Sequence, residues 1–214
     1  METNKPDKKE HILETAERVF AELGYEGAST RLLAKEAGVN MAMLNYYFGS
    51  KDGLLEAVLK RRISGMHQAL QEVINRSELS SWDKLFQITD LYLDRVLTNK
   101  RFHRLIHREL SLMQRSDDLY QSVFDAISKN VMAFKEVIEK GVADGTFRKV
   151  DVELTTACIF GTKYYLINSR QIASKLLETD ISQPEIMENE VKPRAKKFFH
   201  DLLKAHLSKH DTEF

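Results

Sequence analysis

The chain has 214 residues, of which 32 are Lys or Arg and 32 are Asp or Glu, so its formal net charge is zero. This balance excludes a protein that is basic all over, but it leaves room for a local basic patch, which depends only on where the charges lie. No run approaches the roughly eighteen apolar residues of a membrane span, and the polar N-terminus METNKPDKKEH lacks the apolar segment of a secretory signal. We therefore expect a cytoplasmic protein without membrane association.

The first two predicted helices come directly after this polar start. Apolar residues between Ile12 and Leu23 recur at helical spacing on one face, and Gly24 is a suitable helix stop. Ser29 can cap a second, short helix that ends at Gly38. Both boundaries thus follow from local sequence signals.

Two further helices follow at once. Asn40 can cap a helix over 41–48, and Ser50 can cap a longer one from Lys51 to about Arg76. The short helices before and after residues 37–39 are separated by a tight turn, which is the pattern of a helix-turn-helix. Three apolar or aromatic residues are expected to pack the back of the second short helix: Leu44, Tyr47 and Phe48.

The rest of the chain also reads as helix. Helices are expected over 82–97, 101–114, about 117–143 and 152–175, and a last one after a loop bounded by Pro184 and Pro193. The prediction is an all-α fold of about nine helices. Cys158 is the only cysteine, which excludes an internal disulfide framework or a multi-cysteine zinc site. Because it stands in an apolar run, we expect a small core residue.

The N-terminal pattern resembles the TetR family of transcriptional regulators. The resemblance spans roughly residues 8–60 and is carried by Phe20, Gly24, Tyr25, Ser29–Ala34, Glu36–Val39, Leu44 and Tyr47–Lys51, followed by Leu54 and Leu55. It implies a three-helix DNA-binding domain over 1–52 and a larger helical effector-binding and dimerisation domain over 53–214. The final two long helices would form the interface of a homodimer.

The resemblance also implies residues that contact DNA. Tyr47 and Lys51 correspond to phosphate-contacting positions, although Tyr47 could be a purely core ring and Lys51 a solvated lysine. Independently, a helix N-terminus with a lysine favours anions, and the same reasoning adds Thr30 and Arg31. The outer side of the recognition helix would carry the remaining candidates: Asn40, Met41, Ala42, Asn45 and Tyr46.

The recognition helix suggests which bases it reads. Apolar side chains can contact thymine methyl groups and Asn can bind adenine, so Met41, Ala42 and Asn45 favour A·T pairs at the contacted positions. The alternative is that Met43 is core and Met41 only touches the DNA backbone. Operators of helix-turn-helix dimers are inverted repeats, so the expected partner is palindromic double-stranded DNA.

The candidate effector-binding residues belong to the central helices. Glu109 lies on the apolar face of its predicted helix, and a buried carboxylate needs a ligand or an internal partner. Tyr164 and Asn168 are polar tips on an apolar helix and suit a pocket or an interface. Met113 lies on the same apolar helix face as Glu109 and is a further effector-binding candidate. Three aromatic residues are expected to be core or, alternatively, to line the cavity: Phe86, Phe124 and Phe134.

The expected function is a DNA-binding repressor that a small apolar or amphipathic effector releases from its operator. The alternatives are a DNA-binding protein of the same fold without such an effector, and a small all-helical enzyme. The sequence contains no legible catalytic constellation and no phosphate-binding glycine loop. His103 and His107 have a spacing that can bind metal, but no further ligand supports such a site. We therefore expect no enzyme, metal or cofactor.

Overall fold

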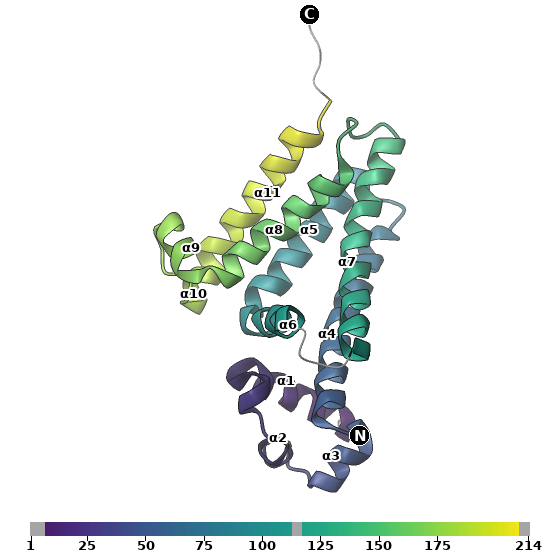
Figure 1. The fold of residues 1–214 in the computed structure, drawn as a ribbon. Helices are drawn as coiled ribbons and strands as arrows, with labels where there is room; N and C mark the ends of the chain where they lie inside the picture. Colours follow the sequence, from purple (N-terminus) through teal and green to yellow (C-terminus); the bar gives the residue numbers. More distant parts are fainter. Residues whose placement is uncertain (1–6, 113–116, 210–214) are drawn as a thin grey trace, which may run out of the picture. The chain divides into compact units, whose positions relative to one another are not determined.

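The computed structural model describes residues 7–112 and 117–209, without the side chains of 101, 109–112, 117–119 and 163 (Figure 1). Within these ranges every regular element is helical, so the predicted all-α fold is confirmed. The elements are α1 Lys8–Gly27, α2 Thr30–Glu36, α3 Met41–Phe48, α4 Lys51–Ile74, α5 Ser81–Thr98, α6 Lys100–Leu112, α7 Asp117–Ala143, α8 Val152–Asn168, α9 Arg170–Leu177, α10 Pro184–Ile186, the π-helix η1 Met187–Val191, and α11 Lys192–Leu207. None of the described helices is long and apolar enough to span a membrane.

The chain forms two compact units. Unit 1 comprises Met1–Gly65 and Arg101–Ile127, and unit 2 comprises Met66–Lys100 and Ser128–Phe214. In unit 1, α1, α2 and α3 gather around the first turns of α4 (Figure 1). Their shared core has no exposed surface at Phe20, Leu44 and Leu54. Unit 1 therefore has its own core, on which the predicted DNA-binding helices rest. The predicted division at residue 52 stays a prediction.

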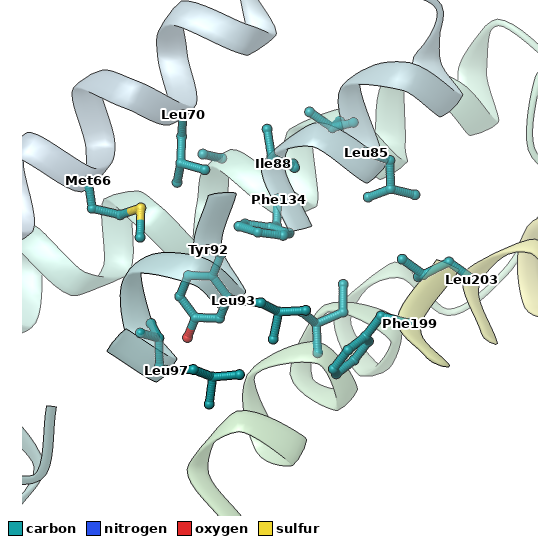
Figure 2. Close-up of a cluster of buried hydrophobic side chains, with 14 of the residues drawn as sticks. Met66, Leu70, Leu85, Ile88, Tyr92, Leu93, Leu97, Phe134, Phe199 and Leu203 are labelled. Carbon is teal, nitrogen blue, oxygen red and sulfur yellow. The ribbon is translucent and has the colours of Figure 1, made fainter. Parts of the chain in front are cut away.

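Unit 2 has a separate core built around aromatic rings. Tyr92 of α5 meets Phe134 of α7 with ring centroids 5.5 Å apart, and Phe160 of α8 lies 4.8 Å from Tyr92 and 5.2 Å from Phe134. Figure 2 shows Tyr92 and Phe134 among aliphatic side chains, with Phe199 of α11 nearby. Burial raises the pKa of the Tyr92 phenol well above its ordinary value. Three helices of unit 2 are thus joined by one aromatic cluster.

Two predicted boundaries in unit 2 were wrong. The expected helix over 152–175 breaks at Ser169, where φ is −107° and ψ is 44°, so α8 and α9 are separate helices. The expected loop between Pro184 and Pro193 is instead helical, because Pro184 occupies the first turn of α10 and η1 continues directly into α11. Proline is tolerated in a first helical turn, where its missing N–H is not needed.

Candidate nucleic-acid interface

The turn between α2 and α3 has the geometry of a helix-turn-helix. Ser29 caps α2 by accepting a hydrogen bond from the Leu32 backbone N–H at 3.2 Å. Gly38 has φ of 62°, a conformation that glycine adopts without steric cost. Asn40 then caps α3, its Oδ1 accepting from the Met43 N–H at 2.7 Å. The predicted capping residues and the predicted turn glycine are therefore confirmed.

Helix α3 has one buried side and one open side. Leu44 is fully buried, and Tyr47, Phe48 and Val39 are half-buried against the core of unit 1. Tyr46 is 83% exposed and Met41 is 43% exposed. The other exposed candidates are Asn40, Ala42 and Asn45, while Met43 is half-buried. The predicted outer residues thus share one surface, and α3 (MAMLNYYF) contains no charged residue at all.

The predicted phosphate contacts flank this surface. Ser50 caps α4 by accepting from the Gly53 N–H at 3.0 Å, which places Lys51 in the first turn. Thr30 is half-buried and Arg31 exposed in the first turn of α2. Positive side chains therefore lie at two helix N-termini, where backbone N–H groups and the helix dipole also favour an anion.

The Lys51 side chain makes a specific contact within unit 1. Its Nζ lies 3.9 Å from the ring centroid of Tyr25, near the end of α1. The Tyr25 hydroxyl donates a 2.6 Å hydrogen bond to Oδ1 of Asp52, the residue after Lys51. The sequence indicates Tyr25 only through the family resemblance. No pattern in the sequence joins it to Lys51.

An ion-pair network ties α1 to α4. Arg61 meets Glu10, Glu14 and Glu17, and the Arg62 Nε donates to Glu17 at 2.7 Å. Glu17 is largely buried, with 13% of its side chain exposed, so its contacts are screened less than those of the other two acids. The network lies along one face of α1 and fixes its position beside α4, the helix that begins with Lys51.

Unit 2 has an exposed apolar face on α8. Leu154, Tyr164 and Tyr165 are 69%, 48% and 36% exposed. Cys158 is also exposed, so the prediction of a core cysteine was wrong: Ala157 and Cys158 are exposed, whereas the next residue, Ile159, is buried. At Gly161 an added Cβ would meet no heavy atom of the described chain within 4 Å. Three more large apolar side chains are exposed on α9 and α11: Ile172, Leu176 and Phe198.

The predicted effector residues differ in burial and are divided between the two compact units. Phe134 is fully buried in the aromatic cluster, whereas Phe86 is half-buried and stacks on His200 at 4.3 Å. Phe124 belongs to unit 1 and is 48% exposed, so it is not the core residue that was one of its two expected roles. Tyr164 and Asn168 lie on the exposed face of α8. The side chains of Glu109 and Met113 lie outside the described set.

A capped helix-turn-helix with an exposed second helix and cationic flanks defines the class of helix-turn-helix transcriptional regulators. Residues 12–58 match the family model for bacterial regulatory proteins of the tetR family, and residues 83–192 match that for the tetracyclin repressor-like C-terminal domain. The chain belongs to the TetR family. It is a transcriptional regulator and not an enzyme, as predicted.

Individual relatives agree with this assignment. The chain is 29% identical over 139 residues to the probable HTH-type transcriptional regulator YttP of Bacillus subtilis, a match that covers 64% of this chain and 66% of YttP. Its fold is similar to the TetR family regulator PfmR from Thermus thermophilus, with TM-score 0.72, 21% identity and coverage of 92% and 99% of the two chains. It is also similar to Bacillus subtilis FadR in complex with stearoyl-CoA, with TM-score 0.64, 20% identity and coverage of 84% and 93%.

Proposed function

We propose that this regulator is a cytoplasmic repressor that binds an inverted-repeat operator as a homodimer. The observation that carries the proposal is the exposed, uncharged surface of α3 between the cationic first turns of α2 and α4. Asn40, Met41, Ala42, Asn45 and Tyr46 read the major groove. Thr30, Arg31, Tyr47 and Lys51 contact phosphates, which set the register of the protein on DNA.

The homodimer forms through the exposed faces of α8 and α11. Several large apolar side chains there have no cover from the described chain, and exposed apolar patches mark interaction sites. A second copy would bury Leu154, Tyr165 and Phe198, and it would set two α3 helices about one DNA turn apart, roughly 34–36 Å. The operator is then an inverted repeat, with A·T pairs at the positions that Met41 and Asn45 contact.

The effector is a small apolar or amphipathic molecule that binds to the C-terminal helical domain. Support comes from the aromatic composition of unit 2 and from the stearoyl-CoA bound to the similar FadR fold. Within unit 2 the effector-contacting residues proposed are Phe86, Phe134, Tyr164 and Asn168, whereas Glu109, Met113 and Phe124 of unit 1 stay sequence predictions for this role. Binding lowers DNA affinity because the effector prefers a conformation in which the two α3 helices no longer match the operator.

Selection of bound sequences from random duplex DNA tests the DNA-binding part of the proposal. Wild type should enrich a palindrome, and Tyr47→Phe/Lys51→Ala should weaken binding to all sequences alike, since phosphate contacts carry no base information. Lys60→Ala is the matched control, because it removes a positive charge from the same helix at a residue that pairs with Glu56. Absence of enrichment by a folded dimer would refute operator binding.

Release of the selected duplex tests the effector. Stearoyl-CoA is the probe, with free coenzyme A as the control that shares its polar part. Release by the acylated compound alone supports an amphipathic effector. If neither compound nor free stearate changes DNA affinity, the proposed effector class is wrong, while operator binding is unaffected.

A further inference from the structure

Tyr25 reaches its position because α1 is interrupted one residue earlier. Gly24 has φ of 72° and ψ of 175°, which lie outside the helical range and which a residue with a side chain rarely adopts. The following turn places the Tyr25 ring parallel to the fully buried Phe20, with an interplanar angle of 4° and centroids 6.0 Å apart. The ring is therefore supported from below by the core of unit 1.

This supported ring restricts the Lys51 side chain. A free lysine side chain has large rotamer entropy, and that freedom is lost when the ammonium binds a phosphate. A cation over an aromatic face is attracted by the ring quadrupole, so the 3.9 Å contact orders Lys51 before DNA arrives. An ammonium has three N–H donors, and the ring face occupies only one direction around it. An ammonium that faces the ring can therefore also donate to a phosphate oxygen.

The hydroxyl of the same tyrosine acts on the neighbouring acid. Asp52 is exposed and lies next to Lys51, where a carboxylate would repel a phosphate. The 2.6 Å bond from Tyr25 is a charge-assisted hydrogen bond, which fixes this carboxylate beside α1. One side chain thus orders the cation with its ring and restrains the anion with its hydroxyl.

We propose that Tyr25 is a positioning residue for DNA binding, which orders Lys51 and restrains Asp52 so that α4 begins with a prearranged phosphate contact. The inference rests on the proposed function, because it takes Lys51 as a phosphate contact. It assigns to the end of α1 a role in affinity without any contact between Tyr25 and DNA.

A double-mutant cycle with Tyr25→Leu and Lys51→Ala tests this role. The probe is the palindromic duplex enriched from the random library, with a dye label, and the readout is fluorescence anisotropy over a series of salt concentrations. Lys51→Ala should lower affinity and reduce the log–log salt slope by roughly 0.9 for each phosphate that the protein no longer neutralises. Tyr25→Leu should lower affinity about two- to tenfold, which corresponds to ordering one long side chain at an interface.

The two effects should not add. In the Lys51→Ala background, Tyr25→Leu should lower affinity by a smaller factor than in wild type, because only the restraint of Asp52 is left to lose; double-mutant cycles detect such coupling. Tyr25→Phe keeps the ring and removes only the hydroxyl, so it should lose less affinity than Tyr25→Leu. Lys60→Ala is again the control. Proton NMR gives a readout without DNA: the ring current of Tyr25 should shift the Lys51 Hε signals upfield in wild type and Tyr25→Phe.

Each outcome decides between the hypotheses. If wild type and Lys51→Ala differ in DNA affinity but folded Tyr25→Leu binds like wild type, or the two losses add fully, the positioning role is refuted and the DNA-binding function stands. If Tyr25→Leu does not fold, an absent ring-current shift in wild type overturns the ordering of Lys51, and unchanged DNA affinity in Tyr25→Phe overturns the restraint of Asp52. If wild type binds no duplex, the proposed function fails and the inference fails with it.

Discussion

Gly161→Ala has opposite expected effects on the isolated chain and on a dimer. Glycine in a helix interior is about 1 kcal/mol less favourable than alanine, and the new Cβ would meet no described heavy atom of the chain within 4 Å. In a protein whose α8 faced only solvent, the substitution should therefore stabilise. The sign of the change in stability therefore distinguishes an α8 face that is open to solvent from one that is packed against a second copy.

The proposed homodimer predicts the opposite result. Gly161 is exposed on the same helix as Leu154 and Tyr165, so helices of two copies can approach most closely at a residue without a side chain. Overpacking of a well-fitted contact costs about 1–3 kcal/mol, which corresponds to a rise of about 5- to 150-fold in the dimer Kd. Over most of this range the overpacking cost exceeds the gain of about 1 kcal/mol in helix propensity.

Sedimentation equilibrium over a range of protein concentrations measures the dimer Kd, and urea unfolding at the same concentrations measures stability. Ser64→Ala is the matched control, because it raises helix propensity at an exposed position of α4, away from the apolar face. It should leave the dimer Kd unchanged. A close helix contact at Gly161 is refuted if Gly161→Ala stabilises the protein at every concentration and self-associates as wild type does.

Four other outcomes are expected. A maleimide should label Cys158 rapidly at protein concentrations below the dimer Kd and slowly at concentrations above it, because the thiol is exposed in the single chain. Mass spectrometry follows the labelling. A labelling rate that does not depend on protein concentration would place the interface elsewhere. Asn40→Ala should remove the cap of α3 and lower the free energy of unfolding in urea by about 1 kcal/mol. Asn40→Asp should keep the cap and the stability but weaken DNA binding, because its negative charge faces the DNA. An equal loss of stability in both variants would argue against capping. Phe134→Ala should cost about 3–5 kcal/mol in urea unfolding, and a loss below 1 kcal/mol would contradict the packed aromatic cluster. Hydrogen bonds from Thr146 lower the pKa of Asp144 from its ordinary 3.8, so the ionised carboxylate stabilises the fold above pH 3.8 and this stabilisation is lost as pH falls through the lowered pKa. Asp144→Asn should therefore be less stable than wild type in thermal unfolding at pH 7, and the difference in stability should narrow below pH 3.8. A difference in stability that does not change with pH would refute this linkage.

The helix-turn-helix could be predicted because its boundaries depend on local chemistry. Ser29 and Asn40 each cap a helix through their own side chain, and Gly38 alone supplies the left-handed residue of the turn. Each signal lies within three residues of the structure that it specifies. The break at Ser169 has no such signal, because neither glycine nor proline stands there. The π-helix η1 could not be predicted either, because its hydrophobic pattern does not differ from that of an α-helix.

Side-chain surroundings were harder to predict than helices. Residues 157–160 are all apolar, yet Cys158 is exposed and its neighbour Ile159 is buried, so an apolar run alone does not indicate which of its residues face the core. The contact between Tyr25 and Lys51 depends on the backbone conformation at Gly24 and on the packing of α1 beside α4. Such a contact joins residues far apart in the sequence, and no single segment contains it.

The uncharged recognition helix has a consequence for how the regulator would behave as cellular ionic conditions change. In the proposed complex the phosphates are held by cations outside α3, and this contribution weakens with rising salt because binding releases counterions from the DNA into the solution. The proposed base contacts come from α3, whose eight residues carry no ionic group. A change in ionic strength should therefore lower occupancy at all sites by a similar factor and leave their ranking intact. The strength of regulation and the choice of target sites would respond to different conditions.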